Sequence, residues 1–231
     1  AYLIGSDGPC VDSDYYYDDA GQADDWYYYY DDDGQDDDLN YYYDDDGQDE
    51  DANEDEDDDG YYYDDASVSV MDDSSIRDAV AAWLADATAA EAAYGHIATW
   101  GTGGVTHMAF LFCAASAVAD CNAAAASFDE DISAWDTSSV TNMRYMFKDA
   151  SAFDQPVGAW RVDKVTHMGE MFYGAASFDH PLASWKVDNV TSMHAMFNGA
   201  SAYRHPLAEW RIDNVKTMSH MFQGASAFIQ P

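Results

Sequence analysis

The sequence predicts an α/β solenoid of strand–helix coils of about 25 residues, with an N-terminal cap helix and an extended non-globular acidic arm before it. Two observations lead to this prediction. A tryptophan recurs at a constant interval, at Trp135, Trp160, Trp185 and Trp210. The stretch before Ala66 holds more than half of the 45 acidic side chains and no Lys or Arg. We expect an acidic arm over residues 1–66, a cap helix over 67–96 and repeats over 97–231.

Within each repeat the apolar residues change their spacing. Trp160 and Val162 alternate with Arg161, as in a strand, and the residues that follow have the three- and four-residue spacing of a short helix. Gly174 lies where a C-cap belongs. The apolar residues with helical spacing are Val165, Met168, Met171, Phe172 and Ala175, and the predicted N-caps are Asp163, Asp188 and Asp213. The recurring Met and aromatic residues are interpreted as core, not as a ligand groove.

A single cap helix is predicted before the repeats. Ser74 or Ser75 provides its N-cap, and Gly95 ends it. Its apolar stripe consists of Ile76, Val80, Trp83, Leu84 and Ala87. We expect this helix to cover the first coil. The repeat register continues to Pro231 without a polar capping segment, so we expect further repeats or a covering subunit at that end.

Two stretches resemble the BspA-type leucine-rich-repeat surface proteins, in the branch of mycoplasma lipoprotein repeats. They are "ISAWDTSSVTNMRYMFKDASAF" and "LASWKVDNVTSMHAMFNGASAY". The segment "IRDAVAAWLADATAAEAAYGHIATW" also resembles the helix that often precedes such arrays. The resemblance covers residues 74–231 and implies a leucine-rich-repeat-like solenoid in an extracellular or cell-surface protein of adhesion or assembly, without enzymatic activity. It does not extend to the acidic arm, and it names no ligand.

The acidic arm is itself repetitive. Glycines recur at a constant interval, at Gly21, Gly34, Gly47 and Gly60, and tyrosine triplets keep the same phase. One interpretation is a disordered, solvated low-complexity tail, and the other is an array whose carboxylates are neutralised by a cation or a basic surface. Most of the 18 tyrosines of the chain lie in the arm, and this aromatic content favours the second interpretation.

The arm is also a candidate calcium site, because hard cations bind several carboxylate oxygens around a tight glycine turn. Its spacing is not that of an EF-hand, since loop positions 1 and 12 fall on Tyr29 and Asn40. The pattern of acids around Gly34 is instead similar to thrombospondin type 3 calcium repeats. The candidate ligands are Asp31, Asp33, Asp37, Asp44, Asp46 and Glu50.

Basic side chains recur at one position of successive repeats, between an inward tryptophan and the next apolar residue. They are Arg161, Lys186 and Arg211. We expect them either to dock an acidic segment or to pair locally with the neighbouring aspartates. Histidines at shared repeat positions, such as His180 and His205, are interpreted as solvated turn residues and not as metal ligands.

Cys113 and Cys121 are predicted to pair across a loop inserted in the first repeat, which would add about 2–3 kcal/mol. Cys10 is then free or bridges to another chain; alternatively, it pins the arm to the insertion. Asn189 begins the one sequon of the chain. It lies at a turn and is either a glycosylation site or a repeat residue near a helix start.

Composition excludes several classes of partner. The formal charge of −36 makes nucleic acid and anionic membranes poor partners. The longest apolar run, from Met108 to Ala119, is too short to span a bilayer. The sequence contains neither a recognisable nucleophile–base pair nor a glycine-rich phosphate-binding loop, so we do not expect an enzyme. The sequence begins with Ala1 and not with Met, so we expect a processed or partial chain. The lack of a visible signal peptide therefore says nothing about the compartment of the protein.

These observations together predict a secreted, non-enzymatic structural protein. We expect a homo-oligomer or a surface filament or sheath, assembled through the arm and the solenoid. One alternative is a cell-surface adhesin that recognises an extracellular protein or glycan. Another is an acidic matrix protein that binds calcium through the arm.

Overall fold

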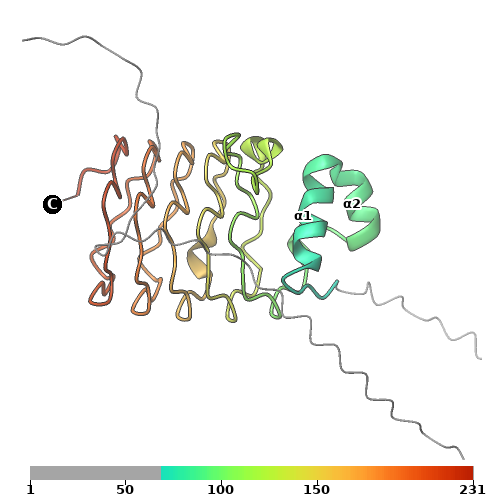
Figure 1. The fold of residues 1–231 in the computed structure, drawn as a ribbon, viewed down its shortest axis with the longest axis horizontal. Coiled ribbons are helices and arrows are strands. Elements are labelled where there is room, and N and C mark those ends of the chain that lie inside the picture. Colours follow the sequence, from blue (N-terminus) through green and yellow to red (C-terminus); the bar gives the residue numbers. More distant parts are fainter. Residues whose placement is uncertain (1–68, 231) are drawn as a thin grey trace, which may run out of the picture. The chain divides into compact units, whose positions relative to one another are not determined.

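A computed structural model describes residues 69–230, all of which lie in one compact unit, Asp59–Pro231 (Figure 1). Two α-helices come first, and the residues after them form a row of stacked coils (Figure 1). The helices are α1 (Ser75–Ala85), α2 (Ala87–Tyr94) and three short 3-10 helices, η1 (Ile97–Thr99), η2 (Ala123–Ser127) and η3 (Val157–Ala159).

The predicted strand–helix solenoid of the leucine-rich-repeat type is wrong. In the described repeats there is no strand, no sheet and no α-helix, and parallel pairing is limited to isolated bridges. One bridge joins Val70 to Gly101, and the other four connect one residue from each of five coils, namely His107, Asn142, His167, Ser192 and Thr217. Between the bridges the chain runs in turns, so no helix follows the aspartates that the sequence assigns as N-caps.

The segment predicted as a helix is a series of turns because one residue in each copy is left-handed. In the third coil this residue is Glu170, with φ 56°. Its counterparts are Phe110, Tyr145, Ala195 and His220. A residue with positive φ interrupts an α-helix. Gly174 is also left-handed, at φ 67°, but it lies in a turn and not at the end of a helix.

Hydrogen bonds between coils take the place of those within a helix. In the second coil, four alternating N–H groups donate to carbonyls of the following coil, at 2.6 to 3.1 Å. The donors are Met143, Tyr145, Phe147 and Asp149. The N–H groups of Met146 and Lys148 instead close turns within their own coil, at 3.3 and 3.1 Å. The same arrangement recurs at the later junctions, so each coil is hydrogen-bonded to the next along this segment.

The alternation around the tryptophans predicts burial correctly, but it does not make a strand. Trp160 and Val162 are buried and Arg161 is exposed. Side chains join the coils here: the indole N–H of Trp160 donates to the carbonyl of Ile132 at 3.2 Å, and the hydroxyl of Thr137 donates to the carbonyl of Arg161 at 3.0 Å. A strand requires backbone pairing, which this segment lacks.

Stacked aromatic rings form the core. One column consists of Phe112, Phe147, Phe172, Phe197 and Phe222, with successive centroids 5.5–5.6 Å apart. A second column runs from Phe128 to Phe228 and packs against the first at 3.9–4.4 Å. Met143, Met168 and Met193 are fully buried beside these columns. The interpretation of the recurring Met and aromatic residues as core is therefore confirmed for the first four coils, whereas in the last coil Met218 is 43% exposed.

The predicted single cap helix is in fact two helices, separated at Asp86. This residue is extended, with φ −157° and ψ 98°, and its carboxylate accepts hydrogen bonds from the N–H groups of Thr88 and Ala89. A side chain that caps the next helix therefore ends the first one. Gly95 ends α2 with φ 73°, at the predicted position.

The side chain that accepts hydrogen bonds at the start of α1 belongs to a residue that the sequence did not single out. The carboxylate of Asp72 accepts hydrogen bonds from the N–H groups of Ser74 and Ser75, at 3.0 and 2.7 Å. Ser74 occupies the N-cap position, as predicted, but its side chain makes no capping hydrogen bond; Ser75 accepts a bond from the N–H of Asp72 at 2.9 Å. In the predicted stripe, Ile76, Val80 and Trp83 are buried, Leu84 is partly buried and Ala87 is exposed.

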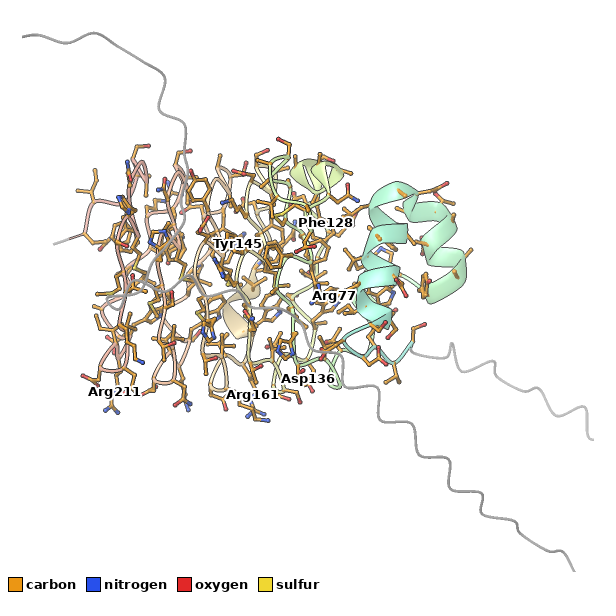
Figure 2. All side chains as sticks on the ribbon, viewed as in Figure 1. Arg77, Phe128, Asp136, Tyr145, Arg161 and Arg211 are labelled. Atoms are coloured by element: carbon orange, nitrogen blue, oxygen red, sulfur yellow. A yellow bond between two sulfur atoms is a disulfide. The ribbon has the colours of Figure 1, made fainter. Side chains whose placement is uncertain are left out.

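Two side chains of the cap take the place of a preceding coil. The guanidinium of Arg77 donates to the carbonyls of Ala109 and His107, at 2.9 and 3.2 Å. At later junctions, carbonyls in these two positions accept backbone N–H groups. The carboxylate of Asp73 accepts from the N–H groups of Thr106 and His107, at 2.7 and 2.9 Å. Figure 2 shows Arg77 between α1 and the coils.

Candidate functional site

We refer to Arg161, Lys186 and Arg211 as the cationic strip. Each of them follows a buried tryptophan in successive coils, and each is exposed. Figure 2 shows Arg161 and Arg211 along one edge of the stack, with Asp136 on the same edge. Because the tryptophans are packed into neighbouring coils, the strip presents three cations from three consecutive coils.

The arginines of the cationic strip are weakly paired with neighbouring aspartates. Arg161 Nε lies 3.4 Å from Asp163, and Arg211 lies 3.5 Å from Asp188 and 3.7 Å from Asp213. The two arginine side chains remain 64% and 74% exposed. The lysine of the strip forms no ion pair with any residue in 69–230. Exposed ion pairs contribute about 0–1 kcal/mol, so an external carboxylate can compete with these contacts.

In the coil before the cationic strip, the equivalent repeat position carries a negative charge, because it is occupied by Asp136. The N–H of Ser138 donates to its carboxylate at 2.9 Å. Hydrogen bonds from Ser138 hold the pKa of Asp136 below 3.8, and the charges of Arg161 and Lys164 lower it further. The carboxylate is therefore ionised at neutral pH and limits the strip to the three later coils.

The sequon residue Asn189 connects two coils. Its amide donates to the carbonyl of Asp163 at 2.7 Å, and Asn214 makes the same contact with Asp188 one coil later, at 2.6 Å. The side chain of Asn189 therefore has a structural role that recurs in the next coil, but no helix starts beside it, which corrects the predicted helix start. It is also exposed, and its glycosylation stays a prediction.

Cys113 and Cys121 form a disulfide, with Cα atoms 4.7 Å apart. The bond closes the inserted loop of the first coil, where the N–H of Asn122 donates to the carbonyl of Cys113 at 2.8 Å. This is the pairing that the sequence favours. Cys10 lies outside the described residues.

The candidate calcium ligands Asp31, Asp33, Asp37, Asp44, Asp46 and Glu50 also lie outside the described residues. In the part of the chain that the structure describes, no group of three or more His, Cys, Asp or Glu side chains is arranged to hold a metal ion. No helix between residues 69 and 230 has the length and apolar content to cross a bilayer.

His180 and His205 join coils, which corrects their interpretation as solvated turn residues. Their Nε2 atoms lie 2.9 and 2.8 Å from the carbonyl oxygens of Asp154 and Asp179 in the preceding coil. Each Nε2 is also 3.4 or 3.3 Å from the carboxylate of the same aspartate. Glutamines make the equivalent carbonyl contact in the flanking coils, so the position has a structural role.

A second group of side chains was not predicted from the sequence. We name it the aromatic cluster, and it consists of Phe110, Arg144, Tyr145, Lys148 and Tyr173. The rings of Phe110 and Tyr145 stack with centroids 4.8 Å apart. Arg144 Cζ lies 4.4 Å from the Tyr145 centroid, and Lys148 Nζ lies 5.0 Å from that ring and 4.5 Å from the ring of Tyr173. Figure 2 shows Tyr145 away from the edge that carries Arg161.

The repeat register holds the signal that would have found the aromatic cluster. Phe110, Tyr145 and Glu170 occupy one repeat position, and Lys148 and Tyr173 occupy another, three positions on. Residues at one repeat position lie above one another in stacked coils. The two positions together therefore place rings and charges side by side across three coils.

The two cations of the aromatic cluster differ in their ion pairing. Lys148 forms an ion pair with Glu170, and these side chains are only 16% and 14% exposed. Arg144 is exposed and donates to the hydroxyl of Tyr145 at 2.6 Å, but it forms no ion pair with a described residue. Burial raises the pKa of the Tyr145 phenol and of the Asp149 carboxyl. Arg144 is therefore the cation of this cluster that remains available to an external anion.

These coils, held together by contacts that recur in every copy, define a stacked-repeat protein with a charged edge. A family model described as "Mycoplasma protein of unknown function, DUF285" matches residues 82–187 and again residues 116–231. The two matches together span residues 82–231, well over half of the chain, and the chain belongs to this family. No curated protein and no solved structure matches the chain.

Proposed function

We propose that this protein is a non-enzymatic extracellular structural protein, a subunit of a surface filament or sheath. In this proposal the acidic arm of one copy docks on the cationic strip of another. One observation carries the proposal: three exposed cations lie in three successive coils, on a chain whose arm holds more than half of the 45 acids and no basic side chain.

The energetics of the strip support docking by exchange of ion pairs. Arg161 contacts a carboxylate of its own coil, and Arg211 contacts one of its own coil and one of the preceding coil, all at 3.4 Å or more and in exposed geometry. Each such contact is weak, so replacing it with a carboxylate of another chain costs little. Several contacts made by one arm raise the effective concentration at the next site, which strengthens the association without any strong single pair.

An oxidising compartment is supported by the disulfide between Cys113 and Cys121, since disulfides form and persist mainly in secreted and cell-surface proteins. The resemblance of the repeats to BspA-like surface proteins supports the same location. Both considerations agree with assembly outside the cell.

The test is sedimentation velocity of the full chain over a range of protein concentrations, at low and at high ionic strength. We expect association at low ionic strength that weakens with salt, because exposed charges are screened. The combined variant Arg161→Gln, Lys186→Gln and Arg211→Gln should associate at least about tenfold more weakly. A chain that stays monomeric throughout would contradict the proposal.

Single variants provide a control matched in charge. Lys186→Gln and Lys216→Gln each remove one exposed cation, the first in the strip and the second outside it. Only Lys186→Gln should weaken association. Equal effects of the two variants would show that net charge, and not the strip, controls assembly.

A further inference from the structure

Arg144 differs from the other arginines of the chain. Arg77 donates to two carbonyls, and the remaining three, Arg161, Arg204 and Arg211, contact carboxylates. Arg144 forms no ion pair with a described residue, and its guanidinium contacts the ring and the hydroxyl of Tyr145. A guanidinium has five N–H donors, so most of its capacity to bind an anion is unused.

The surroundings hold Arg144 in place before any ligand arrives. The half-buried Tyr145 ring stacks on Phe110 at 4.8 Å, with 24° between the planes. The guanidinium lies over this ring at 4.4 Å and is tied to its hydroxyl at 2.6 Å. Because the side chain is already ordered, binding an anion would cost less conformational entropy than at a free surface arginine.

Aromatic surface accompanies this cation. Phe110, Tyr145 and Tyr173 are half-buried, so each keeps part of its ring exposed. Lys148 forms an ion pair with the neighbouring Glu170 and so offsets the charge that would otherwise repel an incoming anion. The matching ligand is therefore a carboxylate directly followed or preceded by an aromatic ring, with its carboxylate on Arg144.

We propose that the aromatic cluster binds a Tyr–Asp unit from the acidic arm of a second copy of this chain, with Arg144 pairing with the aspartate and the tyrosine packing on the exposed rings. The chain supplies this chemistry four times, in tyrosine triplets followed directly by Asp18, Asp31, Asp44 and Asp64. The proposal rests on the proposed function, and it adds partly exposed aromatic rings on which the tyrosines of the arm can pack.

The experiment measures self-association of the full chain by sedimentation velocity in four forms: wild type, Arg144→Gln, Arg144→Lys and Lys216→Gln. We expect Arg144→Gln to weaken association about tenfold. Arg144→Lys should be nearly as weak, because an ammonium keeps the charge but lacks the planar fork that pairs with a carboxylate. Lys216→Gln should behave as wild type. Wild-type association by Arg144→Gln would overturn the proposal.

Competing peptides separate the two halves of the unit. The peptide YYYDDDGQ, residues 28–35, should dissociate the wild-type assembly at about tenfold lower concentration than AAADDDGQ. With Arg144→Gln this difference should disappear. Equal potency of the two peptides against wild type would overturn the proposal.

The two proposals fail in different ways. Association that requires the cationic strip but is insensitive to Arg144→Gln would overturn the role of the aromatic cluster and leave the proposed function in place. A chain that is monomeric under all conditions would overturn both. If the arm instead binds the aromatic cluster of its own molecule, the peptides would bind without dissociating the assembly. This result would also overturn the proposal of a second copy.

Discussion

Tyr203 is the one tyrosine in a column that otherwise contains phenylalanine. Its ring is fully buried and stacks between Phe178 and Phe228, at 5.9 and 6.0 Å. Its hydroxyl is buried and has no hydrogen-bond partner in the described part of the chain. Burial, and then the nearby carboxylate of Asp179, raise the pKa of this phenol far above its ordinary value of 10.0. A buried hydroxyl without a partner destabilises the folded state.

We therefore expect Tyr203→Phe to raise the free energy of unfolding by about 1 kcal/mol at neutral pH. Above pH 10 the phenol ionises in the unfolded chain but not in the folded one, so wild type loses stability as the pH rises. The variant lacks this contribution and should lose less. Urea unfolding at neutral and alkaline pH measures both effects. Tyr94→Phe, which also removes one phenol, is the control, and equal alkaline losses in the two variants would refute the explanation.

At the scale of elements, the N-terminal cap imitates a coil with two side chains, one on α1 and one just before it. The guanidinium of Arg77 supplies the donors that a preceding coil would supply, and the carboxylate of Asp73 supplies an acceptor. Burial raises the pKa of Asp73, but hydrogen bonds from Thr106 and His107 outweigh this effect and lower it overall. Helix packing alone would leave these backbone groups of the first coil without partners.

Arg77→Met keeps the length of the side chain and removes both hydrogen bonds. We expect the free energy of unfolding to fall by about 1–3 kcal/mol, because two carbonyls at the junction lose their donor. Arg161→Met removes an exposed guanidinium and should change stability by about 0.5 kcal/mol or less. Urea unfolding of the two variants makes the comparison. Similar losses would mean that the cap is held by apolar packing alone.

At the scale of the whole molecule, stability is a sum over similar junctions. Each coil contacts its neighbours through the same backbone bonds, indole bonds and ring stacks. Proteins built in this way behave approximately as one-dimensional arrays, in which a unit can be removed without loss of the rest. A deletion should therefore be tolerated when it keeps the constant interval from one tryptophan to the next.

Deletion of residues 160–184 removes one whole coil and joins Ala159 to Trp185, which keeps the register. We expect the shortened chain to fold cooperatively, with lower stability and a smaller denaturant m-value, because less surface is buried. Deletion of residues 160–171 brings inward and outward positions out of register. That variant should not fold. Circular dichroism and urea unfolding distinguish the outcomes, and loss of folding in both variants would contradict the array description.

Burial could be predicted from the sequence, but the backbone could not. Spacing marks Met168 and Phe172 as inward whether the chain forms a helix or consecutive turns, so the core was predicted correctly. The left-handed Glu170 could not be recognised, because residues other than glycine seldom adopt positive φ. The strip follows directly from the register. Lys148 and Glu170, in contrast, meet on a diagonal between two different repeat positions, a contact that no repeat period indicates.

The alternation of donors in the second coil has a consequence for how the molecule opens. If the third coil separates, the amides of Met143 and Tyr145 lose their acceptors, while those of Met146 and Lys148 keep the bonds within their own turns. Neighbouring amides are therefore exposed by different openings. Some are exposed when two coils separate, and the others only when the coil itself unfolds. The hydrogen-exchange rates of the alternate amides in this segment therefore report how often the two coils at each junction separate.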